Sequence, residues 1–433
     1  MSTNAELHQR RMAAVPRGVA NSLAVYADRA SNAELWDVEG KRYVDFASGI
    51  AVLNTGHRHP SIVRAIAAQL EKLVHTCFQV TPYASYIEVC EQLNRLAPGP
   101  TPKKSMLFST GAEAVENALK VARYHTKRSG VIAFSGSFHG RTLAAMTLTG
   151  KVQPYKAGFG PMVPSVFHAP FPMAYHGVSV ADSLDAIEAL FKSDIDPAQV
   201  AAIIIEPVQG EGGFYAAPPE FLRALRALCD KHGILLIIDE IQSGFGRTGR
   251  MFAVEYAGIE PDLMTVAKSI AGGVPLSGLV GKAEIMDAPP PGGLGGTYAG
   301  SPLGCAAALA VLEVMKGEKL LERSLHVGER LQARLRALQK RFPQIGEIRG
   351  LGAMVAMELV KNGKAEQPDA DLTRALVQSA ARHGLVILSC GVYGNVIRFL
   401  APLTIPDALL DEGLDKLEAA LTEVTAAASQ AAA

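Results

Sequence analysis

Short, nearly continuous apolar runs between residues 105 and 285 constrain the fold of this chain more than any other feature. The runs SMLFS, GVIAF, AAIIIEP, GILLIID, LMTVA and SGLVG do not alternate polar with apolar residues, as strands with one solvated face do. Strands that are apolar throughout are typical of a sheet covered on both faces, and such sheets are mostly parallel. Amphipathic helical patterns separate several of the runs, at residues 112–126 and 218–233 among others. The sequence therefore predicts an α/β fold with a mainly parallel sheet.

The pattern changes after residue 300. A long helical pattern, broken near Gly317, is followed by strand-like runs (GAMVAMELV, GLVILSC, NVIRFLAP) mixed with helices. We therefore predict three parts: an N-terminal segment (1–57), a large α/β domain (58–310) and a smaller C-terminal α+β domain (311–433). In the first part, WDVEGKRYVDFASG predicts a hairpin that turns at Glu39 and Gly40. The pattern alone does not say which domain this segment packs against.

Composition limits the classes of function. Lys plus Arg equals 42 and Asp plus Glu equals 42, so a balanced charge disfavours nucleic acid and anionic membrane surfaces as partners. The N-terminus has no apolar signal region, and no 18-residue apolar run lacks charges. The five cysteines are scattered and none stands in a CxxC, which is typical of reduced thiols in a cytoplasmic protein. His57 and His59 stand two apart without a carboxylate or cysteine cluster, so we predict no metal site.

Two opposite charges follow predicted strands. Asp239 ends the apolar run of IIDEIQSGFGRTG, and Lys268 follows the run at 263–267 and precedes small and turn-forming residues. Ligands of open α/β sheets bind at the carboxyl ends of the strands. The two residues would lie there side by side and grip one planar cofactor from two directions. The alternatives are a carboxylate that caps the next helix and a surface lysine at a strand end.

Two further segments combine a strand end with polar groups. In FSTGAEAVENA, a turn opens a helix whose free N–H groups suit a phosphate, although ordinary helix capping explains the same pattern. In SGSFHGRT, Phe138 suits stacking on a flat ring and Arg141 suits a substrate carboxylate. A core aromatic and a solvated arginine are the alternatives. Neither segment contains a Walker sequence or GxGxxG, so nucleotide binding is disfavoured.

Taken together and in order, these segments resemble the class III pyridoxal-phosphate aminotransferases. Asp239 and Lys268 occur with TGAEAVENA, SFHGRT, EPVQGEGG and GGTYAGSPLG, and the match runs from about residue 10 to 420. Within the class, GIAVLNTGHRHP, HTCFQVTPY, GLGGTYAGSP and ILSCGVYGNVIR resemble the 4-aminobutyrate aminotransferases most. The resemblance implies the fold type I of pyridoxal-phosphate transferases, with a large domain and a smaller C-terminal one.

The resemblance also implies roles around pyridoxal 5′-phosphate. Lys268 matches the lysine that bonds covalently to the cofactor, and Asp239 matches the residue that keeps the pyridine nitrogen protonated. The remaining expected cofactor residues are Gly111, Ala112, Phe138, His139, Glu206, Ile241, Gln242 and Thr297. Thr297 matches a phosphate ligand that comes from the partner subunit in the family, which implies a homodimer or homotetramer with shared active sites. Relatives often carry Ser at Ala112 and Tyr at Phe138, so each position here lacks one hydroxyl.

The substrate residues follow from the same resemblance. Arg141 matches the group that binds the distal carboxylate of an ω-amino acid, and Arg398 matches the one that binds the α-carboxylate of glutamate or 2-oxoglutarate. Glu211 matches the partner of Arg398, which neutralises that arginine when the donor has no α-carboxylate. Ile50 matches an apolar wall, where ornithine-type relatives tend to carry an aromatic residue. These matches imply amino transfer from 4-aminobutyrate to 2-oxoglutarate in a ping-pong cycle.

The sequence does not exclude several other functions. The same fold would serve 5-aminovalerate, β-alanine or N-acetylornithine as donors, and one methylene discriminates by only about 1–3 kcal/mol. A related decarboxylase or mutase would release carbon dioxide or an isomer in place of glutamate. A binding protein that kept the fold would lack a bound yellow cofactor. A nicotinamide dehydrogenase is disfavoured because no GxGxxG follows a strand.

Overall fold

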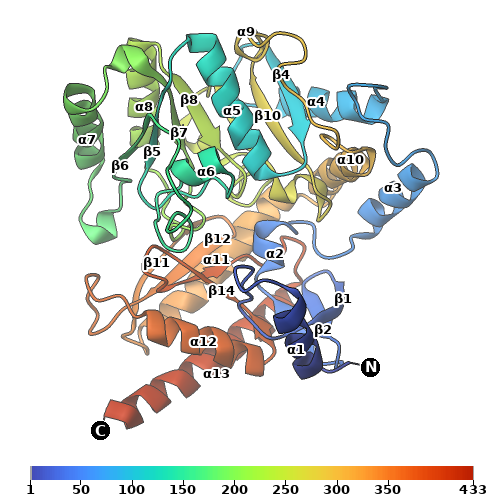
Figure 1. The fold of residues 1–433 in the computed structure, drawn as a ribbon. Helices are drawn as coiled ribbons and strands as arrows, with labels where there is room; N and C mark the ends of the chain where they lie inside the picture. Colours follow the sequence, from blue (N-terminus) through green and yellow to red (C-terminus); the bar gives the residue numbers. More distant parts are fainter. Residues whose placement is uncertain (1, 433) are drawn as a thin grey trace.

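The computed structural model describes residues 2–432, and the predicted sheet occupies the upper half of the view in Figure 1. Within these residues the sheet has seven strands in the order β4-β10-β9-β8-β7-β5-β6. Their bounds are β4 (Lys103–Phe108), β5 (Gly130–Phe134), β6 (Val166–Ala169), β7 (Val200–Ile205), β8 (Leu235–Asp239), β9 (Leu263–Val266) and β10 (Ser277–Lys282). The strands from β9 to β6 pair in parallel, whereas β10 is antiparallel to both of its neighbours. The predicted α/β class with a mainly parallel sheet is confirmed.

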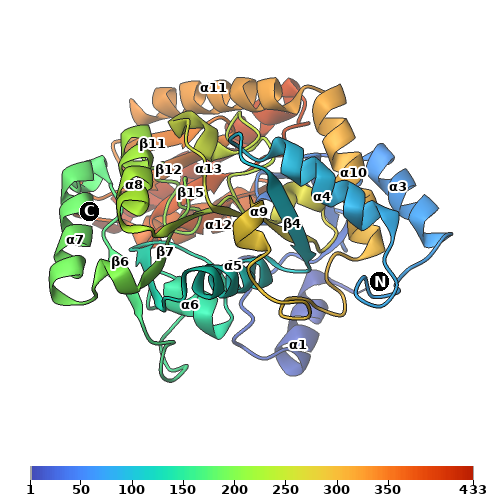
Figure 2. The same cartoon turned by 90° about the horizontal axis from the view of Figure 1, so that it is seen from above.

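Helices cover both faces of this sheet, which explains why its strands are apolar throughout. Strands β5, β7 and β8 are buried at every position. Figure 2 shows α5 and α6 on one side of the sheet and α8 on the other, with α4 near its β4 edge. The helices of this part are α3 (Pro60–Leu70), α4 (Ala84–Leu96), α5 (Gly111–Thr126), α6 (Leu143–Leu148), α7 (Val180–Ser193), α8 (Pro219–His232) and α9 (Ala283–Met286). Short 3₁₀ helices are η1 (Ala174–His176), η2 (Pro197–Gln199), η3 (Ala253–Ala257) and η4 (Lys268–Ala271).

The N-terminal segment joins a sheet that a C-terminal strand completes. Its elements are α1 (Asn4–Ala14), β1 (Ala27–Ser31), β2 (Glu34–Asp37), β3 (Arg42–Asp45) and α2 (Ser48–Ala51). The predicted hairpin is confirmed as the antiparallel pair of β2 and β3. Strand β13 (Leu385–Val386) then pairs with β3 in parallel, so the segment packs on the C-terminal part. This pairing settles a point that the sequence pattern left open.

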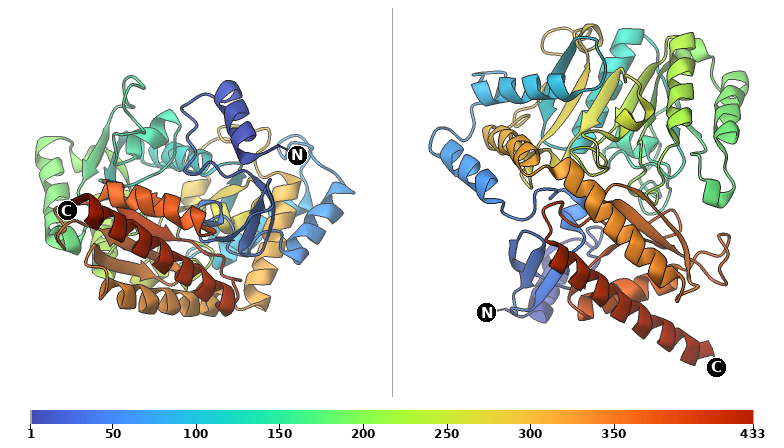
Figure 3. Two further views of the ribbon diagram at one scale, coloured as in Figure 1. Left: turned by 90° about the horizontal axis from the view of Figure 1, so that it is seen from below. Right: turned by 180° about the vertical axis from the view of Figure 1, so that it is seen from behind.

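The C-terminal part contains the third sheet, in the order β11-β12-β15-β14. The strands are β11 (Ile345–Leu351), β12 (Met354–Leu359), β14 (Leu388–Cys390) and β15 (Val396–Phe399). The helices of this part are α11 (Leu320–Gln339), α12 (Ala370–Arg382) and α13 (Asp407–Ala432). Helix α10 (Pro302–Gly317) precedes them and packs against α3, α4 and η4 of the large domain. Figure 3 shows α10 running from the large sheet towards this part, with α12 and α13 side by side. The exact boundaries at 57/58 and 310/311 stay predictions.

His57 and His59, the two histidines of TGHRHP, each have a carboxylate partner. His57 pairs with Asp45 at 2.8 Å, while His59 pairs with Glu318 at 2.8 Å and accepts the Ser61 N–H at the start of α3. The two histidines thus face different carboxylates. Among residues 2–432, no group of three or more His, Cys, Asp or Glu side chains gathers as metal ligands would. In the same part of the chain, no helix is long and apolar enough to cross a membrane.

Candidate active site

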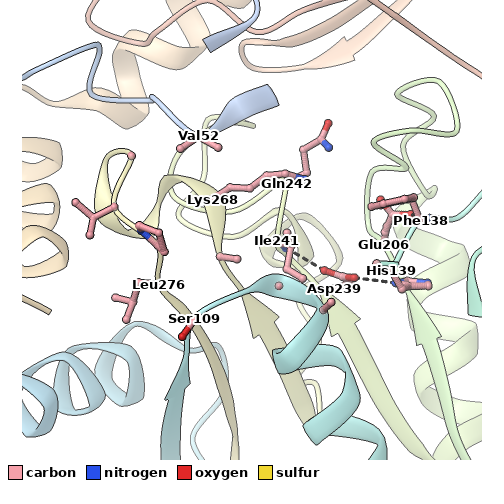
Figure 4. Close-up of a pocket in the computed structure, with 17 residues that line it drawn as sticks. Val52, Ser109, Phe138, His139, Glu206, Asp239, Ile241, Gln242, Lys268 and Leu276 are labelled. Atoms are coloured by element: carbon pink, nitrogen blue, oxygen red, sulfur yellow. Dashed lines mark hydrogen bonds and ion pairs between the residues drawn. The ribbon is translucent and has the colours of Figure 1, made fainter. Parts of the chain in front are cut away.

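A pocket of about 340 Å³ opens at the carboxyl ends of the parallel strands (Figure 4). It brings together nine of the residues predicted from the sequence: Gly111, Ala112, Phe138, His139, Glu206, Asp239, Ile241, Gln242 and Lys268. Further residues line it that the sequence did not single out: Val52, Ser109, Gly140, Ala267, Gly273, Val274, Pro275 and Leu276. These are mostly apolar or small, and no motif marks such wall residues in a sequence. The location agrees with the general position of ligand sites in open α/β sheets.

Lys268 is separated from the end of β9 by Ala267 alone and begins the 3₁₀ helix η4. Its backbone lies in the left-handed region, with φ at 49°, a conformation that costs free energy for a residue with a side chain. Within residues 2–432, its Nζ has no hydrogen bond or ion pair. Burial lowers the pKa of this amine, although the carboxylates of Glu211, Asp239 and Glu206 act to raise it. A larger share of neutral amine, which is the nucleophilic form, follows from the lowered pKa.

Asp239 is the last residue of β8 and is only 3% exposed. One carboxylate oxygen accepts the backbone N–H of Ile241 at 3.1 Å, and the other lies 2.7 Å from Nδ1 of His139. The Nε2 atom of His139 is buried without a hydrogen-bond partner in the described part of the chain. The two contacts fix the carboxylate in orientation at the pocket wall. The capping alternative is not realised, because turns rather than an α-helix follow β8.

Glu206 and Gln242 form the polar wall next to Asp239. Glu206 accepts the backbone N–H groups of Phe138 at 2.8 Å and Gly210 at 2.9 Å. Burial raises the pKa of Glu206 to about 7, and the nearby Asp239 acts in the same direction. A Cβ atom on Gly210 would lie 2.5 Å from Nε2 of Gln242, so glycine allows this close approach. The Oε1 atom of Gln242 is buried without a partner among the described residues.

Helix α5 begins at the edge of the pocket. Thr110 caps it: its hydroxyl accepts the Glu113 N–H at 3.2 Å, and the Glu113 carboxylate accepts the Thr110 N–H at 2.9 Å. Capping and ligand binding are therefore compatible here, because the cap uses Thr110 and Glu113 and leaves Gly111 and Ala112 on the pocket side. The first turn of a helix offers free N–H groups and a partial positive charge. A Cβ atom on Gly111 would lie 2.9 Å from Cδ1 of Ile241.

The donor set of this pocket fits pyridoxal 5′-phosphate. The start of α5 offers N–H groups to a phosphate, the fixed carboxylate of Asp239 suits a protonated ring nitrogen, and the free amine of Lys268 suits an aldehyde. Phe138 provides a flat apolar face. The two unpartnered polar atoms, on His139 and Gln242, are the kind of group that a polar ligand satisfies.

A buried ion pair joins the large sheet's loops to the C-terminal sheet. Glu211 pairs with Arg398, which lies on β15 and is only 4% exposed. Burial acts to raise the pKa of Glu211, but the Arg398 guanidinium outweighs it and the pKa is lowered. Only one nitrogen of the guanidinium is used, and Nε of Arg398 is buried without a partner in the described residues. The arginine therefore retains donors for a second carboxylate.

The remaining predicted residues lie outside the pocket lining. Arg141 is exposed and has no ion pair within residues 2–432; its guanidinium lies 4.9 Å from the ring centre of Tyr155. Ile50 is 40% exposed in α2, and Val52, two residues later, lines the pocket. Thr297 lies on an exposed loop before α10. Tyr155 belongs to no motif, so sequence reasoning had no signal for it.

The geometry agrees with the comparison to known families. Residues 14–421 match the family model of class-III aminotransferases. This chain belongs to the class-III aminotransferases, and enzymes of this class depend on pyridoxal 5′-phosphate. The chain is 57% identical to a 5-aminovalerate aminotransferase of Pseudomonas putida, with 98% of this chain and 99% of the relative covered.

Two other relatives extend the comparison. A 4-aminobutyrate aminotransferase of Escherichia coli is 56% identical over 96% of this chain and 97% of its own length. An ornithine aminotransferase structure from Toxoplasma gondii, described with partial occupancy of pyridoxal phosphate at the active site, has a TM-score of 0.86. It is 30% identical, and the match covers 98% of this chain and 96% of that one.

Proposed function

We propose that this enzyme transfers the amino group of 4-aminobutyrate to 2-oxoglutarate, giving succinate semialdehyde and glutamate. The observation that carries the proposal is the buried pair of Glu211 and Arg398. 4-Aminobutyrate has no α-carboxylate, so Arg398 would face it without a counter-charge unless the protein supplied one. A buried charge stripped of its partner costs about 3–5 kcal/mol. Glu211 supplies the counter-charge of Arg398 while 4-aminobutyrate is bound. It releases Arg398 when glutamate or 2-oxoglutarate brings its own α-carboxylate.

The other residues predicted from the sequence have separate roles in this reaction. Bound pyridoxal phosphate supplies an aldehyde carbon and an electron-withdrawing ring. Lys268, with its lowered pKa, takes the proton from the carbon of the donor that bears the amino group. Asp239, fixed by His139 and the Ile241 N–H, holds a positive charge at the far end of the ring site. Arg141 binds the distal carboxylate, and Ile50 borders the path of the methylene chain.

A second donor, 5-aminovalerate, is favoured by specific relatives. Two proteins named 5-aminovalerate aminotransferases, from Pseudomonas putida and Pseudomonas aeruginosa, are 57% and 59% identical to this chain. The switch of Glu211 serves either donor, since neither has an α-carboxylate. The donors differ by one methylene, which a pocket discriminates by only about 1–3 kcal/mol.

The test is the donor half-reaction alone. The purified enzyme loaded with pyridoxal phosphate is mixed with 4-aminobutyrate in the absence of a keto acid, and the visible cofactor band is followed. Loss of the band with release of one succinate semialdehyde per site supports the proposal. 5-Aminovalerate is then ranked by its single-turnover rate. If the cofactor band did not change with 4-aminobutyrate but changed with 5-aminovalerate or an ornithine-type amine, the responding compound would be the donor in place of 4-aminobutyrate.

We also propose a homodimer or homotetramer with shared active sites in the cytoplasm. Thr297 supports the shared site, because it is exposed and stands outside the pocket of its own chain. The cysteines support the compartment, because all five are free. Light scattering of the native enzyme measures the assembly. A monomeric active enzyme would contradict the shared site.

A further inference from the structure

Arg141 has an aromatic neighbour that neither a motif nor the pocket lining points to. Its guanidinium carbon lies 4.9 Å from the ring centre of Tyr155 and 6.0 Å from that of Phe138. The two rings are 5.0 Å apart and tilted by 59°. Arg141 is exposed and has no carboxylate partner in residues 2–432. Tyr155 is thus the nearer of the two rings that contact this unpaired arginine, and a ring face at this distance orders a guanidinium.

Tyr155 also lies within electrostatic reach of the Glu211–Arg398 pair. Burial raises the pKa of its hydroxyl, Glu211 acts in the same direction, and the guanidiniums of Arg141 and Arg398 oppose them. The ring is therefore neutral at physiological pH and stands among the charges that the two proposed carboxylate sites use. A neutral aromatic face attracts a guanidinium without supplying a carboxylate that would compete with substrate.

The loop that carries Tyr155 is tied to both sides of the site. Lys156 donates to the backbone oxygen of Thr147 in α6 at 3.0 Å. Lys151 donates to the backbone oxygen of Gly391 at 2.9 Å, and the Gly391 N–H donates to the backbone oxygen of Glu211 at 2.9 Å. Gly391 lies in the turn between β14 and β15, and β15 carries Arg398. The loop therefore connects the position of Arg141 with that of Arg398.

We propose that Tyr155 is a specificity-determining positioning residue, whose ring holds the Arg141 guanidinium at the place where it meets the distal carboxylate of the donor. This inference deepens the proposed function and rests on it. The hydroxyl is not needed for the role, because the contact is with the ring face. Loss of the ring should weaken the recognition of the carboxylate and leave the chemistry at the amino group unchanged.

The test compares Tyr155→Leu with Tyr155→Phe in the enzyme loaded with pyridoxal phosphate. Tyr124→Leu is a matched control, since the Nζ atom of Lys127, at the end of α5, lies 3.6 Å from the ring centre of Tyr124, in a cation–π pair that the proposed function does not use. Calorimetric titration with butyrate measures carboxylate affinity without turnover. Kinetics with 4-aminobutyrate and with 1-aminobutane, which has no carboxylate, measure the effect on the reaction.

We expect Tyr155→Leu to weaken butyrate binding and to raise KM for 4-aminobutyrate by about three- to tenfold, the range of a cation–π contact. The kcat value and the rate with 1-aminobutane should stay near those of the wild type. Tyr155→Phe and Tyr124→Leu should behave as the wild type does. If the leucine variant does not fold, Tyr155→Met removes the ring with a similar length of side chain.

Unchanged butyrate affinity in the leucine variant would overturn the inference, and so would an equal loss with both amines, which indicates a merely structural role. A phenylalanine variant as weak as the leucine variant would assign the effect to the hydroxyl and also overturn it. The proposed function fails separately, if the wild type does not convert 4-aminobutyrate. The butyrate affinities then still decide the role of Tyr155.

Discussion

The two ends of the site are held by different kinds of structure. At the cofactor end, Asp239 ends β8 and Lys268 comes just after the adjacent parallel strand β9, and backbone groups fix the neighbouring carboxylate of Glu206. At the substrate end, Arg398 comes from the C-terminal sheet and Glu211 from a loop of the large sheet. The cofactor end therefore lies at the edge of one sheet. The substrate end forms only where a loop of the large sheet meets the C-terminal sheet.

The charges at the two ends differ in the same way. The Asp239 carboxylate has two neighbouring groups, His139 and the Ile241 N–H, that hold its orientation. The Glu211 carboxylate has one side-chain partner among the described residues, a single nitrogen of Arg398. A fully held charge suits a permanent electrostatic role, whereas a singly held one suits exchange between substrates.

The largest effect is expected at the cofactor end from Lys268→Ala. Without the amine, the enzyme loses both the covalent attachment and the proton transfer, so kcat should fall about 10⁴-fold or more. The control is Lys104→Ala, which removes an exposed lysine of β4 that pairs with Asp287 at the end of α9 and should leave kcat unchanged. Steady-state turnover with 4-aminobutyrate and 2-oxoglutarate measures both. Wild-type turnover in the Lys268 variant would mean that another residue is the nucleophile.

A smaller loss is expected from Asp239→Asn. The amide retains an oxygen for the Ile241 N–H but removes the negative charge beside His139, so kcat should fall about 10²- to 10³-fold. Affinity for pyridoxal phosphate, measured by equilibrium dialysis, should fall as well. Activity within twofold of the wild type would show that a charge at this wall is not required.

The next residue, Glu240, has a fully buried carboxyl group that does not line the pocket, in contrast to the carboxylate of Asp239. It accepts the Ser243 hydroxyl at 2.5 Å and the Val254 N–H at 2.7 Å, and burial raises its pKa to about 7. A carboxyl with a raised folded pKa contributes stability that is complete below its ordinary pKa of 4.5 and is lost as the pH rises through about 7. The amide of Glu240→Gln does not titrate and keeps its contribution at every pH. The free energy of unfolding of the wild type, relative to that of the variant, should therefore be about 2 kcal/mol lower at pH 8.5 than at pH 5.5, as measured by chemical denaturation. A pH-independent difference would contradict the raised pKa.

The fold and the cofactor end were largely predictable because their signals are local. Continuous apolar runs predicted covered parallel strands, and Asp239 and Lys268 were conspicuous as charges at the ends of such runs. The direction of one strand was less predictable: β10, which lies between β4 and β9, has an apolar pattern like that of its neighbours but runs antiparallel to both. An apolar run records burial on both faces, not direction.

At the substrate end, the residue pattern alone marked only Arg141; Glu211 and Arg398, which are 187 positions apart, were accessible only through resemblance. The parallel pairing of β3 with β13 joins residues more than 300 positions apart, and no periodicity announces it. Tyr155 stands in a loop with no motif and gains its neighbours Arg141 and Phe138 only in three dimensions. The catalytic and binding roles of the individual residues stay predictions that the variants described here test.

Glu211→Ser distinguishes an exchangeable Glu211–Arg398 pair from a purely structural one. The measurement is kcat/KM for 4-aminobutyrate and for glutamate as amino donors, with Glu211→Asp as the variant that keeps the charge. Removal of the carboxylate leaves buried Arg398 unpaired with 4-aminobutyrate but paired with the α-carboxylate of glutamate. The serine variant should lose at least about tenfold more activity with 4-aminobutyrate than with glutamate, and the aspartate variant should lose less. Equal losses with both donors would show that Glu211 does not exchange with the substrate carboxylate.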